Sequence, residues 1–168
     1  MARDLIPKLS KFAGDVVSNV TAAETPGIKA ACVRIVSQGD PEEPGKTLDP
    51  DEVKRFARHC AERTIRGLFD HDGVADLLKG AKLSEDSVEA MSRYASEVIK
   101  SVAEQLHDEF YRTLWHQVRA CTGENIAVRM RSAAKLVPDK AVEDFVKRCS
   151  ELTVHLLFEH QGVVETLR

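Results

Sequence analysis

The sequence predicts an all-α fold: a tandem duplication of a three-helix unit, packed as one pseudo-twofold helical bundle. Apolar residues recur every three to four positions along most of the chain, which is typical of helices that bury one face. Residues 53–78 also recur as residues 142–167, 89 positions later, which indicates a repeated structural unit. The positions that coincide are Val53/Val142, Phe56/Phe145, Cys60/Cys149, Glu62/Glu151, Thr64/Thr153, Leu68/Leu157, Phe69/Phe158, His71/His160, Gly73/Gly162, Val74/Val163 and Leu78/Leu167.

The first part of the chain predicts two helices and a loop. The apolar spacing favours one helix over residues 4–22 and another over residues 28–38. Thr25-Pro26-Gly27 is expected to separate them, because proline lacks the amide hydrogen that a helix interior needs. Residues 39–47 are acidic and rich in Pro and Gly, so we expect a loop there.

A third helix is predicted from Asp49, which is suited to capping its start, to about residue 72. Gly73 is expected to end it as a left-handed C-cap, with His71 close to the free carbonyl groups of the last turn. A short helical turn over residues 74–79 should connect it to the second half.

The second half predicts one unusually long helix. Ser84 caps a helical pattern that continues without a break over about residues 85–120. Such a helix would be roughly 50 Å long, so we expect it either to bend near residues 106–116 or to project at one end. Two further helices are predicted over residues 124–136 and 140–160.

All three helices of the first half have a counterpart in the second half. We therefore expect a first repeat with a short connecting helix over residues 1–80 and a second repeat over residues 81–168, packed as one globular unit. About 13 extra residues then precede the second helix of the second repeat. The matching segments are residues 9–20 with 91–102 at an offset of 82, residues 31–37 with 126–132 at an offset of 95, and the third helices at an offset of 89.

The composition excludes several classes of protein. Hydrophobic residues make up 43% of the chain and aromatic residues only 5%, so the core must consist mainly of Val, Leu, Ile and Ala. The net charge of -3 provides no basic surface for phosphate backbones, which makes nucleic acid an unlikely partner. No apolar run reaches the roughly 20 residues of a membrane span, and the N-terminal residues do not form a signal peptide. We expect a cytoplasmic protein.

No pattern of catalytic or metal-binding residues is recognisable. The four cysteines lie far apart without a Cys-x-x-Cys pair, and we expect them to be buried free thiols. His71 and His160 are retained in both repeats and could either cap helices or bind a metal near the twofold axis; the capping role needs no ion and is preferred. Phosphate-binding loops and hydrolase motifs are missing. The sequence therefore predicts a protein that is not an enzyme, with no cofactor and no metal.

The predicted function is protein–protein interaction. We expect an adaptor or regulatory module that engages a partner helix, or a second copy of itself, through an apolar groove or helix face. Its binding residues are expected where the second repeat departs from the first, because added aromatic residues outside a shared core need a reason. The alternative is that these residues only cap the core. They are Phe110, Tyr111, Leu114, Trp115 and Val118.

Two other functions stay open. A bundle with a Val- and Leu-lined cavity between the repeats could hold a lipid or another small apolar ligand. Residues 82–105 (KLSEDSVEAMSRYASEVIKSVAEQ), a short turn and then a long helix with Ser at its cap, resemble the central helix of a histone fold. Residues 122–146 (TGENIAVRMRSAAKLVPDKAVEDFV) are similar in rhythm to the last helices of a core histone. The resemblance implies heterodimerisation rather than DNA binding, since the basic tails and loop arginines of DNA-wrapping histones are missing.

Overall fold

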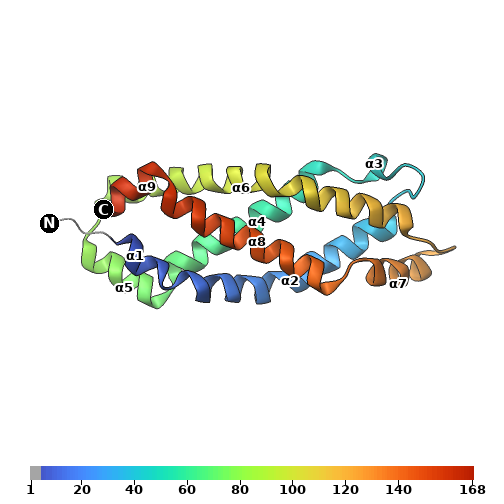
Figure 1. The fold of residues 1–168 in the computed structure, drawn as a ribbon, viewed down its shortest axis with the longest axis horizontal. Coiled ribbons are helices and arrows are strands. Elements are labelled where there is room, and N and C mark those ends of the chain that lie inside the picture. Colours follow the sequence, from blue (N-terminus) through green and yellow to red (C-terminus); the bar gives the residue numbers. More distant parts are fainter. Residues whose placement is uncertain (1–4) are drawn as a thin grey trace.

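The computed structural model describes residues 5–168, and over this range the chain forms helices joined by short connections, with no strand (Figure 1). The predicted all-α fold is confirmed. Four long helices make up most of the structure, and shorter helices lie near their ends. The helices are α1 (Ile6–Ser10), α2 (Ala13–Gln38), α3 (Pro44–Thr47), α4 (Pro50–Asp70), α5 (Asp72–Ala81), α6 (Glu85–Ala120), α7 (Ile126–Leu136), α8 (Asp139–Glu159) and α9 (Gln161–Leu167).

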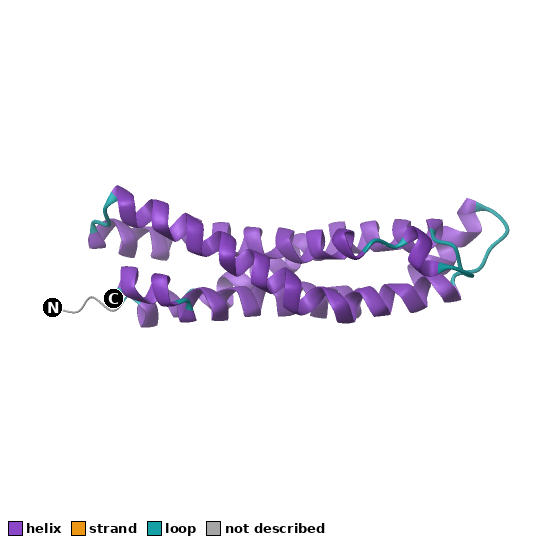
Figure 2. Cartoon of the chain, turned by 90° about the horizontal axis from the view of Figure 1, so that it is seen from above, coloured by secondary structure: helices purple, strands orange, loops and turns teal. Residues whose placement is uncertain are grey.

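The long helices α2, α4, α6 and α8 form an elongated up-down-up-down bundle (Figure 1 and Figure 2). α2 and α6 run away from the end of the bundle where the C-terminus lies, and α4 and α8 return to it. The short helices α1, α5 and α9 lie at that end, whereas α3 and α7 lie at the other. α2 packs against α7 and α8, α4 packs against α6, and α4 and α8 cross near the middle. Each half of the chain therefore buries its apolar faces against the other half.

The α2 helix continues through Pro26, so the predicted break at Thr25-Pro26-Gly27 is wrong. The proline nitrogen cannot donate to the carbonyl of Ala22, a loss that costs about 3 kcal/mol in a helix interior. The helix persists because its buried face continues on both sides of the proline, with Val20 before it and Ile28 after it. The chain breaks its helical path instead between α1 and α2. The predicted helix start, at residue 4, lies outside the described residues.

His71 and His160 cap helices, but they do so at the start of the following helix. The Nδ1 atom of each ring accepts a hydrogen bond at 3.1 Å from the backbone N–H of the glycine two positions later. Each histidine is therefore the N-cap of α5 or α9. The prediction that Gly73 is a left-handed C-cap is wrong, since among the described glycines only Gly123 has a positive φ.

An aromatic ring over each capping histidine explains the neighbouring glycines. The ring centroid of Phe12 lies 4.7 Å from that of His71, and the ring centroid of Tyr94 lies 4.8 Å from that of His160. A Cβ atom on the glycine two residues after either histidine would overlap the aromatic ring. Glycine is needed here because the ring approaches the backbone closely, and the backbone conformation itself would accept other residues.

The other boundaries differ from the prediction in smaller ways. α6 covers Glu85–Ala120 as predicted, and the Ser84 hydroxyl caps it by accepting from the N–H of Ser87 at 3.1 Å. Of the two expectations for α6, a bend or a projecting end, the projecting end is wrong, because α6 lies along the elongated bundle (Figure 1). The predicted loop over residues 39–47 contains the short helix α3. α7 begins at Ile126, two residues later than predicted, with Asn125 as its N-cap.

The register between the two halves is simpler than predicted. The offset of 82 persists to the ends of α2 and α6, at Gln38 and Ala120. At this offset residues 31–37 align with residues 113–119 within α6, which is an alternative to the predicted match to residues 126–132, and α7 lies between α6 and α8 in the chain. α4 and α8 each have 21 residues and the same histidine after them. The equal length of α4 and α8 and the shared histidine are what a duplication would produce. The duplication, its pseudo-twofold symmetry and the boundaries of the repeats stay predictions.

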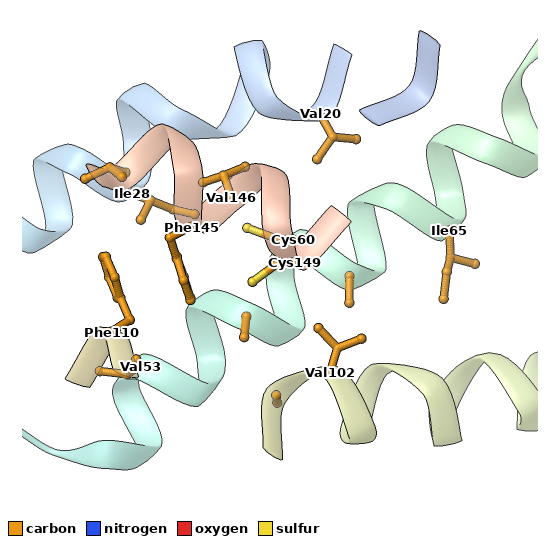
Figure 3. Close-up of a cluster of buried hydrophobic side chains, with 14 of the residues drawn as sticks. Val20, Ile28, Val53, Cys60, Ile65, Val102, Phe110, Phe145, Val146 and Cys149 are labelled. Carbon is orange, nitrogen blue, oxygen red and sulfur yellow. The ribbon is translucent and has the colours of Figure 1, made fainter. Parts of the chain in front are cut away.

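The centre of the core lies where α4 and α8 cross (Figure 3). Cys60 of α4 faces Cys149 of α8, and the hydroxyl oxygens of Thr64 and Ser150 are 2.8 Å apart. Thr64 donates its hydrogen to the carbonyl of Cys60 at 2.7 Å, so Ser150 is the donor to Thr64. These four side chains are at most 1% exposed. Their hydroxyl groups are buried only because each has a hydrogen-bond partner.

All four cysteines are buried free thiols, as predicted. Burial raises the pKa of the Cys32 thiol to about 12. Hydrogen bonding with Cys60, together with burial, also raises the pKa of Cys149. The thiols of Cys32 and Cys149 therefore stay protonated at neutral pH, and all four cysteines pack as small buried side chains.

Replacing Gly162 with Ala should destabilise the protein, because the added methyl group overlaps the ring of Tyr94. We expect the free energy of unfolding, measured by urea denaturation, to fall by about 1–3 kcal/mol. Gly27→Ala is the matched control: it lies inside α2 with open space at its Cβ position, so this change should stabilise the protein by about 0.5–1 kcal/mol. Equal effects of the two substitutions would contradict the close-approach explanation.

Candidate docking groove

The five residues predicted to bind a partner divide into a buried group and a surface pair. Phe110, Leu114 and Val118 are 7%, 0% and 0% exposed and belong to the core. Tyr111 and Trp115 are half-buried. The three core residues offer no surface to a partner in this conformation, which corrects that part of the prediction.

The buried residues belong to the core that both halves share. They correspond to Ile28, Cys32 and Val36 of α2, 82 positions earlier, which are 5%, 0% and 0% exposed. The prediction treated this part of α6 as an insertion because it matched residues 126–132 to the end of α2. The repeat of apolar positions every four residues along both helices was the sequence signal for this alternative register.

Tyr111 and Trp115 fill the edge of the bundle between α6 and the connection that contains α3. The Tyr111 hydroxyl donates to the carbonyl of Leu48 at 3.4 Å, and both rings lie beside α3. Farther along the same edge, Lys54 of α4 forms an ion pair with Glu104 of α6 at 3.3 Å. The protein therefore covers this edge with its own side chains.

The corresponding edge between α2 and α8 is open and forms a groove with a volume of about 1000 Å³. α2 forms the floor, α8 forms one wall, and Met130 of α7 completes the lining. The floor is mostly apolar, and its side chains are small or medium in size. We call this feature the α2 groove, defined by the face of α2 between Val17 and Val33 together with Met130, Asp139, Glu143 and Lys147.

The α2 groove is open because α2 carries smaller side chains than α6 at corresponding positions. The position of Tyr111, whose ring reaches the connection before α4, is taken by Lys29, whose narrower side chain pairs with Asp139 at the start of α8. The Glu104 carboxylate of the Lys54–Glu104 ion pair has no counterpart on α2. The differences at the offset of 82 are Lys29 for Tyr111, Val33 for Trp115 and Ala22 for Glu104.

The walls of the groove carry charges, and one of them is unpaired. Lys29 forms an ion pair with Asp139 between α2 and α8. Lys147 lies 3.9 Å from Glu151 on α8. Glu143 forms no ion pair or hydrogen bond with any residue that the structure describes. An apolar groove with a free carboxylate on its wall is suited to a ligand that is both apolar and positively charged.

The α7 helix beside the groove exposes its bulky apolar residues. Ile126, Met130 and Val128 are 57%, 44% and 36% exposed, and they are three of the four large hydrophobic residues that are exposed within residues 5–168. The one buried residue of α7 is Ala133. Arg129 holds the helix on the end of α2 by donating to two backbone carbonyls at 2.7 Å and 2.6 Å. A helix normally faces its large apolar residues inward, so α7 presents an unusual amount of apolar surface beside the groove.

A carboxylate near the groove fixes α2 against α4. Glu24 accepts a hydrogen bond from Arg63 at 3.0 Å and lies 2.7 Å from Nε2 of His59. Burial raises the pKa of Glu24, but the hydrogen bonds from Arg63 and His59 outweigh burial and hold the pKa below its ordinary value. Thr25 and Pro26 follow directly in α2, so this contact positions part of the groove floor.

A second hollow of about 470 Å³ lies between α6 and α8. The rings of Phe110 and Phe145, stacked with centroids 4.0 Å apart, lie among its walls. An ion pair between Glu109 and Arg148 at 3.1 Å lines the same hollow. Because its charges are paired and its volume is smaller, it is a weaker candidate than the α2 groove.

The described residues contain no cluster of three or more His, Cys, Asp or Glu side chains that could hold a metal ion. His71 and His160 already use Nδ1 to accept from the backbone, so the proton of each neutral ring is on Nε2. The Nε2 atoms lie 3.7 Å from Asp15 and 2.6 Å from Glu97 respectively. Both ring nitrogens of each histidine therefore have a partner within the protein.

Comparisons with known protein families, curated proteins and solved structures find no match to this chain. The resemblance of residues 82–146 to a histone fold gains no support from them, and α6 is one of four long helices in a bundle. None of the described helices combines the length and the apolar character of a membrane span.

Lowering the pH should remove the contribution of Glu24 to stability. Its pKa in the folded protein is below the ordinary value of 4.5, so the contribution is present above pH 4.5 and is lost as the pH falls through the folded-state pKa. Glu24→Gln should reduce the free energy of unfolding by roughly 1 kcal/mol at neutral pH, and the difference from the native protein should shrink in acid. Glu62→Gln, at an exposed position of α4, is the control and should show no such pH dependence. A difference for Glu24→Gln that stays constant with pH would contradict the assignment.

Proposed function

We propose that this protein is a non-catalytic interaction module that docks an amphipathic helix in the α2 groove. One observation carries the proposal: the bundle has an open, apolar-floored groove with a free carboxylate, Glu143, on its wall. Helices dock in such grooves by burying apolar side chains spaced one turn apart, while charges on the rim fix their orientation. Such a module would serve as a cytoplasmic adaptor or regulatory subunit.

The dimensions of the α2 groove suit a helix. The α2 face between Val17 and Val33 corresponds to roughly 24 Å of helix, which matches a segment of about four turns. Ala22, Pro26 and Ala30 present little side-chain volume, so a docked helix could approach α2 closely. The groove therefore favours a partner with large side chains of its own.

The filled edge between α4 and α6 indicates the chemistry of that partner. There, two large aromatic residues four positions apart, Tyr111 and Trp115, cover the apolar surface. A lysine on one helix also pairs with a carboxylate on the other. By the same logic, a helix in the α2 groove should present bulky apolar residues at a spacing of three to four and a cation for Glu143.

This proposal changes the roles of the residues predicted from the sequence. Tyr111 and Trp115 support the connection between α2 and α4 rather than binding a partner. Binding of a lipid or other small apolar ligand between the repeats is less favoured, because Cys60, Cys149 and their neighbours fill the centre of the bundle. The α2 groove, which is open and carries charges, suits a peptide better than a lipid chain.

Filling the groove should abolish docking. We would select binders from a displayed library of amphipathic helical peptides and measure their affinity by calorimetry. Ala22→Trp should weaken these peptides at least about 10-fold, because the indole occupies the floor of the groove. Ala23→Trp is the matched control: this neighbouring residue is also exposed but does not line the groove, so binding should be unchanged.

The same experiment tests the earlier assignment of Trp115. Trp115→Ala should leave the affinity of the selected peptides within about 2-fold, since this ring lies on the opposite edge. Equal weakening by Ala22→Trp and Ala23→Trp, or failure to select any peptide, would overturn the proposed function.

A further inference from the structure

We infer that the helix that docks in the α2 groove is α7 of a second copy of this chain, so that two copies form a reciprocal twofold dimer. The inference rests on the proposed function of the groove. It follows from a complementarity within the chain: α7 has the side chains that the groove lacks. An interface of this kind, in which one patch contains both complementary parts, is typical of twofold homodimers.

The α7 helix has the apolar and positive character that the groove requires. Ile126 and Met130 lie one turn apart and are 57% and 44% exposed. Arg131 and Lys135 lie on the exposed side of α7 and form no ion pair with any described residue. The helix, with the sequence IAVRMRSAAKL, contains no acidic residue. α7 is therefore a basic helix that packs Ala133 against the core and leaves Ile126 and Met130 exposed.

The groove carries the opposite charge at a position that the fold leaves unpaired. Glu143 of α8 corresponds to Lys54 of α4, 89 positions earlier, and Lys54 pairs with Glu104. On α2 the position of Glu104 is taken by Ala22, which cannot pair with a charge. Glu143 is exposed and unpaired within the described residues, so it is available to a cation from outside the chain, and Arg131 or Lys135 of a second α7 supplies one.

The α7 helix cannot fill the groove of its own chain. Ala133 is its buried contact, and Arg129 anchors it to the carbonyls of Ser37 and Gly39 at the end of α2. Of its residues, only Met130 reaches the groove. The large apolar side chain at Ile126 therefore stays in solvent in the single chain.

The position of α7 beside the groove makes reciprocal docking possible. A twofold axis running past Met130 would bring the α7 helix of each copy over the α2 groove of the other. The same contact then forms twice. Stable interfaces bury at least about 1,200 Å² in total. Two reciprocal contacts bury twice the area of a single docked helix of 11 residues, and so come closer to this value.

The test is the self-association of the full chain, measured by sedimentation equilibrium over a wide concentration range. We expect a monomer–dimer equilibrium, and Ile126→Glu and Met130→Glu should each raise the dissociation constant at least about 10-fold, because they place an acid against the apolar floor. Both residues are well exposed, so the variants should keep the circular dichroism and the melting temperature of the native protein. Val88→Glu is the matched control: Val88 is 55% exposed on α6, away from the groove, and this variant should dimerise normally.

Charge reversal identifies the contact itself. Glu143→Lys should weaken the dimer, and so should Arg131→Glu combined with Lys135→Glu. All three changes together should restore association, because they exchange the charges across the interface. A protein that stays monomeric at every concentration, or a dimer that responds to Val88→Glu but not to Met130→Glu, would overturn the inference. If the chain is monomeric while selected peptides still bind the groove, the proposed function stands and only the identity of the docked helix is wrong.

Discussion

The crossing of α4 and α8 is the contact on which the rest of the bundle depends. The residues at the crossing are small: Cys60, Thr64, Cys149 and Ser150 are all buried, and their size lets the two helices approach closely. Hydrogen bonds between the hydroxyl groups remove the cost of burying them. Around this crossing, α2 packs mainly against α8 and α6 packs mainly against α4, so each pair has an edge to cover.

The two edges of the bundle differ in how they are covered, and this difference creates the candidate site. On one edge, Tyr111 and Trp115 reach from α6 to the connection before α4. On the other edge, shorter side chains on α2 leave a groove, and the helix α7 lies beside it with its apolar residues exposed. The groove thus results from the small side chains on α2 and from the position of α7 beside it. Its lining combines an apolar floor of small residues with one carboxylate, Glu143, that is unpaired among the described residues.

The sequence predicted the helical class, the limits of α6 and the burial of the cysteines, because these follow from local periodicity and from caps such as Ser84. It did not predict that α2 passes through Pro26, since packing on both sides of the proline decides that outcome. The roles of His71 and Gly73 depended on the ring of Phe12, which is distant in sequence. The groove was missed for the same reason: small residues on α2 are informative only once α8 is known to lie opposite them.

The most direct test of this account is a set of isotope-filtered nuclear Overhauser measurements on a mixture of labelled and unlabelled chains, which detects contacts between copies only. The account predicts cross-peaks from the Ile126 methyl groups of one copy to Ala22 and Ala30 of the other, since α7 should lie over the α2 groove. Intermolecular cross-peaks that connect other helices, with none between α7 and α2, would contradict it.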